Sequence, residues 1–140
     1  LGQAVVIDNK PGGGTTIGGV EFFGLGAGVP VTPWGWSFDL DDEAAAAMLA
    51  PCPENAVLVL HSPPQGHCDA NGSGDHFGSS ALLHTIEEKS PRLAVCGHIH
   101  ESRGTDEIGR TRVVNPGPAS AGHYALVEVS ATISVRIDDM

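Results

Sequence analysis

Two short apolar runs in the middle of the chain have the pattern of buried strands. Residues 56–60 read Ala-Val-Leu-Val-Leu and residues 93–96 read Leu-Ala-Val-Cys, and neither run alternates with polar residues. Between them, residues 79–89 carry one apolar stripe and one polar face, which predicts an amphipathic helix. A strand, a helix and a second strand form a parallel crossover unit, which brings the ends of both strands to the same edge of a sheet.

Turn and capping residues predict further elements on both sides of this unit. Short breaks between apolar stretches are typical of hairpins, and an acidic residue before an alanine-rich stretch is typical of a helix start. These elements are a hairpin over residues 15–25, a helix from Asp39 or Asp41 to residue 49, a hairpin over residues 103–115 and a terminal hairpin over residues 123–137. Together they predict an α/β fold.

Histidines follow both buried runs. His61 comes directly after the first, and His98 and His100 follow the second behind Gly97, which we expect to supply a sharp turn. Because the strand ends share an edge, the three imidazoles should converge, and imidazole is a ligand for Mn, Fe, Zn, Co and Ni. In an extended backbone, His98 and His100 would lie about 6–7 Å apart, at roughly 3.3 Å per residue. That separation favours a curled loop around one ion or one histidine on each of two ions; the alternative is that all three bond only to backbone.

Further candidate functional residues lie in the loops. His67 and His76 belong to the sixteen-residue loop over residues 62–77, where they could contact substrate phosphate, act as catalytic proton donors, or be solvated loop residues. Trp34 and Trp36 could form the floor of a substrate cleft, or pack in the core or at its rim.

Asn115 and the cysteines have two interpretations each. Asn115 could orient a metal-ligating histidine from behind, or it could be an ordinary turn residue before a proline. Cys96 precedes Gly97 and is expected to be a small buried residue rather than a nucleophile. Cys52, Cys68 and Cys96 form no C-x-x-C pair, which favours a reduced, cytoplasmic environment over a disulfide framework.

The charge balance limits the possible partners. Seventeen acidic and seven basic residues give a formal net charge of −10. Non-specific binding to nucleic acid or to an anionic membrane needs clustered Lys and Arg, so neither is expected. An anionic substrate can still bind if metal ions rather than arginines hold it. No apolar run approaches the ~20 residues of a membrane span.

Three segments together resemble the calcineurin-like metallophosphoesterases. They are His61 with Ser-Pro-Pro behind it, the Gly97-His98-Ile99-His100 segment, and the Asn-Pro-Gly sequence that begins at Asn115; the resemblance covers roughly residues 19–130. It implies a phosphate-ester substrate, metal-activated water, and two divalent ions among Mn, Fe, Ni and Zn. It also implies that His61 and His98 bind one ion and His100 the other. The complete fold of this family is a four-layer α/β/β/α sandwich.

The chain departs from the family in one respect. The family's first three motifs, Asp-x-His, Gly-Asp-x-x-Asp and Gly-Asn-His-Asp/Glu, supply the other ligands and a catalytic histidine, and none occurs in these 140 residues. We therefore expect residues 19–140 to be a partial domain, the carboxyl-terminal half of such a sandwich, with little activity alone. The alternative is a non-enzymatic fragment or fusion product that binds a metal ion or a partner. No oligomeric state follows from the sequence.

Residues 1–18 resemble a different family. Their Leu-Gly-Gln-x-Val-Val pattern, which continues to Thr-Ile-Gly, is similar to a segment of tripartite tricarboxylate transporter receptors. This resemblance leaves their membership of the domain open, and it makes a solute-binding receptor a further alternative. We expect a short strand over residues 5–8, a loop over residues 11–14, and loose packing of residues 1–14 against the rest.

Overall fold

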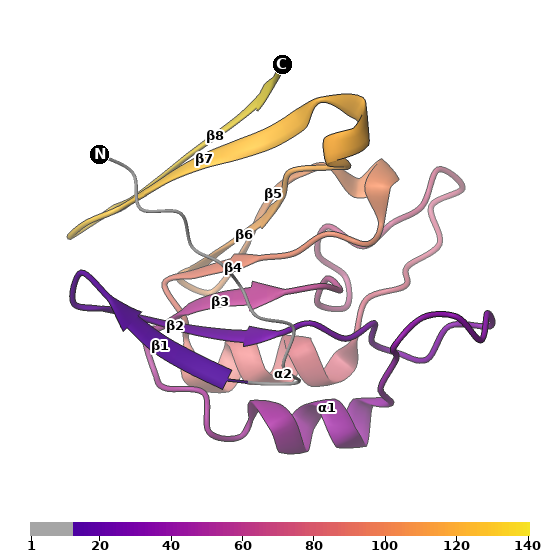
Figure 1. Ribbon diagram of the computed structural model, residues 1–140, viewed down its shortest axis with the longest axis horizontal. Coiled ribbons are helices and arrows are strands. Elements are labelled where there is room, and N and C mark those ends of the chain that lie inside the picture. Colours follow the sequence, from indigo (N-terminus) through magenta and orange to yellow (C-terminus); the bar gives the residue numbers. More distant parts are fainter. Residues whose placement is uncertain (1–12) are drawn as a thin grey trace.

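The computed structural model describes residues 13–140 (Figure 1). The strand expected over residues 5–8, and the expected loose packing of residues 1–12, lie outside the described residues. Six strands form one sheet in the order β1-β2-β3-β4-β6-β5, and two further strands, β7 and β8, form a separate hairpin. Strands β2, β3, β4 and β6 run parallel, while β1 and β5 are antiparallel strands at the two edges.

The observed elements follow the pattern predicted from the apolar runs and turns. The first half contains β1 (Gly13–Ile17), β2 (Val20–Leu25), α1 (Asp42–Leu49), β3 (Val57–Leu60) and α2 (Ser80–Lys89). The second half contains β4 (Leu93–Val95), the 3-10 turn η1 (His100–Ser102), β5 (Gly104–Ile108), β6 (Thr111–Asn115), the 3-10 turn η2 (Ala119–Ala121), β7 (His123–Val129) and β8 (Ile133–Asp139). The crossover unit of β3, α2 and β4 is confirmed, because β3 and β4 are parallel neighbours.

The two faces of the main sheet have different partners, as Figure 1 shows. Alternate strand residues such as Leu58 and Ala94 pack with both helices in one apolar cluster. The intervening residues, such as Val57 and Leu93, pack against the apolar face of the β7–β8 hairpin. This alternation is the period-two pattern of strands buried on both faces. The described residues thus form helix, sheet and hairpin layers, and the predicted α/β class is confirmed.

Side-chain caps begin both helices. The Asp41 carboxylate accepts a hydrogen bond from the Ala44 amide at 2.8 Å, so α1 is capped by Asp41 and not by Asp39. The Ser79 hydroxyl accepts from the Leu82 amide at 3.2 Å at the start of α2. Each cap satisfies one of the amides that the first turn of a helix leaves without a partner.

The predicted loop over residues 11–14 is wrong at its described end. Gly13 and Gly14 belong to β1 and pair with Gly24 and Phe23 of β2. The reason is that the Gly18–Gly19 turn fixes a hairpin register, which the ladder then extends to every residue that faces β2. The proposed division between residues 1–18 and residues 19–140 stays a prediction. No helix within residues 13–140 combines the length and the apolar character needed to cross a membrane.

Candidate metal centre

His61 and His98 lie together at the edge where the parallel strands end. The ladder continues past the assigned strands, because the His61 amide donates to the Leu25 carbonyl at 3.1 Å and the Gly97 amide donates to the His61 carbonyl at 3.0 Å. The side chains then meet: Nε2 of His61 is 3.0 Å from Nδ1 of His98, and the ring centroids are 4.8 Å apart. The predicted convergence of these two histidines is observed.

The turn before His100 is tighter than the sequence suggested. His98 itself has a left-handed backbone, with φ of +66°, and the Ile99 amide donates to the Gly97 carbonyl at 2.8 Å. This is a γ-turn centred on His98, and the expectation that Gly97 supplies the turn is wrong. A left-handed non-glycine residue is strained, and such strain gathers at functional sites. Because His100 then enters η1, the extended spacing does not apply and the segment is curled. Whether its two histidines serve one ion or two stays a prediction.

Asn115 bonds the backbone of this curled segment. It is buried, with 1% of its surface exposed, at the end of β6. Its Nδ2 donates to the Ile99 carbonyl at 2.8 Å, between the two histidines of the segment, and its Oδ1 accepts from the Gly117 amide at 3.0 Å. Asn115 therefore bonds the backbone between the two histidines, and it also makes the ordinary turn contact. Its role in orienting a metal ligand stays a prediction.

Asp39 brings a carboxylate to the same region. Its Oδ2 accepts from the Thr32 amide at 2.8 Å and from the hydroxyls of Thr32 and Ser37, which closes the loop that precedes α1. Its Oδ1 is buried and has no hydrogen-bond partner among the described residues. The Thr32 hydroxyl bond is the main cause of a lowered pKa of Asp39, and the charge of His98 contributes less. The sequence indicated Asp39 only as a possible helix cap.

The electrostatics of the site favour neutral imidazole at His61. Burial is the largest cause of the lowered pKa of His61, and His98 and His100 lower it further, while Asp39 opposes them. Neutral imidazole is the form that binds metal ions. The convergence of His100 with these two histidines stays a prediction.

The side chains present fit part of a metal site. Two imidazole nitrogens converge. The buried Oδ1 of Asp39 has no partner among the described residues and lies against Gly28. Within residues 13–140, however, no group of three or more His, Cys, Asp and Glu side chains is arranged to hold an ion. The set of His61, His98 and His100 as metal ligands therefore stays a prediction, and further ligands are needed to complete it.

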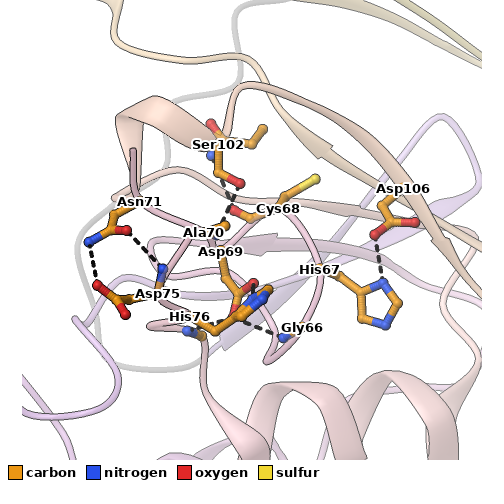
Figure 2. Close-up of polar contacts among 12 residues, drawn as sticks. Gly66, His67, Cys68, Asp69, Ala70, Asn71, Asp75, His76, Ser102 and Asp106 are labelled. Carbon is orange, nitrogen blue, oxygen red and sulfur yellow. Dashed lines mark hydrogen bonds and ion pairs between the residues drawn. The ribbon is translucent and has the colours of Figure 1, made fainter. Parts of the chain in front are cut away.

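The long loop after β3 is built around Asp69, as Figure 2 shows. Asp69 is 1% exposed, its Oδ1 lies 2.6 Å from Nδ1 of His76, and its Oδ2 accepts from the amides of Gly66 and Gly78 at 2.8 and 3.0 Å. Burial tends to raise the pKa of Asp69, but the bonds from His76 and the two amides outweigh it, so the pKa is lowered. His76 is thus held in place while 56% of its side chain stays exposed.

His67 is held by a second carboxylate. Its Nδ1 lies 2.8 Å from Oδ2 of Asp106 on β5, on the side of the loop away from His76 in Figure 2. Neither loop histidine is simply solvated, but whether they touch substrate or transfer a proton stays a prediction. The sequence did not reveal Asp106 as the partner of His67, because only the fold brings β5 to this loop. It also gave no sign that Asp69 pairs with His76.

Two other groups of candidates are also placed. Trp34 and Trp36 stack with ring centroids 5.8 Å apart, and Trp36 is 82% exposed, so packing in the core is wrong for it. Cys96 is buried and its pKa is raised by burial, which suits a small core residue rather than a nucleophile. Burial likewise raises the pKa values of Cys52 and Cys68 to about 11.

Several longer proteins are similar in sequence to part of this chain. The chain is 31% identical over 110 residues to a UPF0046 protein, K07C11.7, of Caenorhabditis elegans, and 43% identical over 72 residues to an uncharacterized protein, MJ1162, of Methanocaldococcus jannaschii. It is 37% identical over 94 residues to metallophosphoesterase domain-containing protein 1 of Homo sapiens. These alignments cover 79%, 48% and 63% of this chain but only 37%, 33% and 29% of those proteins. The chain thus spans about a third of the length of the curated relatives it matches.

Solved structures share the fold. One crystal structure matches 91% of this chain and 52% of its own, with a TM-score of 0.72 and 25% identity. The protein TT1561 of Thermus thermophilus matches 90% of this chain and 56% of its own, with a TM-score of 0.56 and 17% identity. The sulfate thiohydrolase SoxB, from the same species, matches 91% of this chain and 24% of its own, with a TM-score of 0.54 and 22% identity.

The sequence model of one protein family also matches this chain. It matches residues 46–138, which include His61, the Gly-His-x-His segment and Asn115. The chain belongs to the metallophosphoesterases of the calcineurin superfamily.

Proposed function

We propose that this chain is the carboxyl-terminal part of a metal-dependent phosphoesterase. The observation that carries the proposal is the 3.0 Å approach of Nε2 of His61 to Nδ1 of His98 at the edge where the parallel strands end. Ligands of open α/β sheets gather at that edge. Family membership and the fold support a hydrolase acting on phosphate esters.

The proposed ligands are the three histidines. His61 and His98 would hold one divalent ion, and His100 would contribute to a second, with Mn, Fe, Ni and Zn as the candidates that imidazole suits. Bound divalent ions supply charge stabilisation for phosphoryl oxygens and lower the pKa of water. Carboxylate ligands are also needed, and we propose that they come from the part of the relatives that this chain does not cover.

We propose that three features of this chain prepare the site. Burial lowers the pKa of His61, which favours the neutral imidazole that binds a metal ion. The Asn115 bond to the Ile99 carbonyl fixes the segment that carries His98 and His100. Asp69 accepts from Nδ1 of His76, which leaves Nε2 of His76 to carry a proton to or from a substrate oxygen.

A non-enzymatic metal-binding module is the second candidate. It is favoured by the finding that residues 13–140 contain no group of three ligating side chains arranged around one point. Such a module would bind one ion weakly through His61 and His98 and would hydrolyse nothing. The two candidates differ in what happens when the missing ligands are supplied.

Hydrolysis of bis(p-nitrophenyl) phosphate with Mn²⁺ or Ni²⁺ separates these candidates. The assay compares this chain with a version joined to the preceding segment of a longer relative, such as the protein of Methanocaldococcus jannaschii. The chain alone should stay near the buffer blank, and the joined protein should be about 10²-fold or more faster, since it regains a catalytic histidine and the carboxylates.

Two histidine substitutions provide the test and its control. In the joined protein, His61→Ala should remove the metal-dependent rate, whereas His84→Ala, an exposed change on α2, should leave it intact. Equal turnover by the chain and the joined protein would contradict the proposal. So would a joined protein that stays inactive while it binds Mn²⁺, which would favour the non-enzymatic module.

A further inference from the structure

Three arginines surround one cavity at the other end of the sheet. This cavity, named here the arginine pocket, has a volume of about 310 Å³ and is lined by Arg92, Arg110 and Arg112, together with Glu107 and residues 131–133. Arg92 directly precedes β4, and Arg112 is the second residue of β6, so the pocket lies where these parallel strands begin. The turn of the β7–β8 hairpin completes its wall.

Each arginine of the pocket makes one hydrogen bond and keeps further donors. A guanidinium group has five N–H donors in a fixed plane. In the described part of the chain, each of the three donates through Nη2 to a single acceptor. These acceptors are the Ser130 carbonyl for Arg92, the Ser90 carbonyl at 3.3 Å for Arg110, and Oε1 of Glu107 at 3.3 Å for Arg112. Several N–H groups of each arginine thus remain for a ligand.

The charge of the pocket is opposite to that of the chain. Three positive side chains and one carboxylate line it, whereas the chain as a whole has a formal net charge of −10 and only seven basic residues. Bringing like charges together is unfavourable unless an anion lies between them. Guanidinium groups match the geometry of phosphate-type oxyanions, because their paired N–H groups bond two oxygens at once.

We propose that the arginine pocket binds a small phosphate-type oxyanion, at a site separate from the proposed metal centre. Its volume is at the low end of ligand sites, which favours a small anion over a large organic molecule. Leu93, which pairs with Arg112, lies five residues before His98, so the two sites are roughly 15 Å apart along the strand direction. The proposal does not depend on the hydrolytic activity.

Titration of the chain with inorganic phosphate and with pyrophosphate, without added metal, tests this site. Amide NMR signals of residues 131–133 should shift to saturation, and chloride at the same ionic strength should not reproduce the shift. Calorimetry should show that Arg110→Gln weakens phosphate binding about tenfold or more, since it removes a charged donor. Arg112→Lys should also weaken binding, because it keeps the charge and loses the planar pair of donors.

Arg136→Gln is the matched control. Arg136 is 65% exposed on β8 and pairs with Asp138, so its loss changes the net charge equally without touching the pocket. The control should change phosphate affinity less than twofold. Phosphate shifts no larger than those of chloride would overturn the proposal, and so would equal weakening by Arg136→Gln and Arg110→Gln, which would mean general charge attraction. Binding of a long nucleic acid without any binding of phosphate would also overturn it.

Discussion

His98 combines a strained backbone with a candidate role as a metal ligand. Its left-handed backbone costs about 1–3 kcal/mol, and the surrounding contacts have to hold it. Asn115 provides one such contact through the Ile99 carbonyl. Asp69 plays a comparable part in the long loop, where a single buried carboxylate holds His76 and two loop amides. At this scale, buried polar residues hold the backbone and the loops that carry the candidate histidines.

Substitution of Asn115 separates its two roles. Asn115→Asp keeps an oxygen for the Gly117 amide but loses the donor to the Ile99 carbonyl. We expect both Asn115→Asp and Asn115→Ala to destabilise the chain by about 1–3 kcal/mol in urea unfolding and to weaken Zn²⁺ binding roughly 10-fold. If Asn115→Asp behaves like the wild type in both measurements, Asn115 is only a turn residue.

Asp69 predicts a particular acid sensitivity. Because its folded pKa lies below the usual 3.8, its contribution to stability is fully present above that pH and is lost as the pH falls through the folded pKa. Asp69→Asn should therefore flatten the dependence of the unfolding free energy on pH below about 4. Asp75→Asn, an exposed change in the same loop, is the control. An unchanged pH profile in Asp69→Asn would refute this role.

At the scale of elements, α1 and α2 are linked through one carboxylate. Asp42, in the first turn of α1, accepts from the Ser79 hydroxyl and from the Ala81 amide at 3.0 Å at the start of α2. The first turn of a helix leaves amides without partners, and Asp42 satisfies one of them from the neighbouring helix. The two helices are thereby fixed together on one face of the sheet.

Loss of this link should be measurable. We expect Asp42→Ala to lower the free energy of unfolding by about 1–2 kcal/mol, since it removes two hydrogen bonds at a helix start. Asp41→Ala, which removes only the exposed bond to the Ala44 amide, should cost less. Urea unfolding followed by circular dichroism compares the two variants, and a larger cost for Asp41→Ala would contradict the assignment.

Local patterns made the elements predictable, while contacts distant in sequence remained hidden. The runs before His61 and Gly97 are apolar on both faces, and the cap at Ser79 is a local signal, so strands and helices followed from them. The γ-turn at His98 lies beside the Ile99 carbonyl to which Asn115 donates from β6, 16 positions further along the chain, and no local signal marks it. The partnership of His67 with Asp106 joins residues 39 positions apart, which periodicity cannot show.

At the scale of the whole molecule, the two proposed sites lie at opposite ends of the parallel strands. Histidines lie where the parallel strands end, and the arginine pocket lies where β4 and β6 begin. Both faces of the sheet are already covered, by helices on one side and by the β7–β8 hairpin on the other. The alignments cover only 37%, 33% and 29% of the curated relatives, which agrees with a metal centre that needs ligands beyond this chain.

The central claim is that His61 and His98 bind a divalent ion together. The most direct measurement is a Zn²⁺ titration followed through the histidine ring nitrogens by NMR. We predict that Nε2 of His61 and Nδ1 of His98 shift together at one equivalent, that His84 does not respond, and that His61→Ala abolishes the shift at His98. Zn²⁺ binding that leaves both rings unchanged, or that persists in His61→Ala with undiminished affinity, would contradict the account.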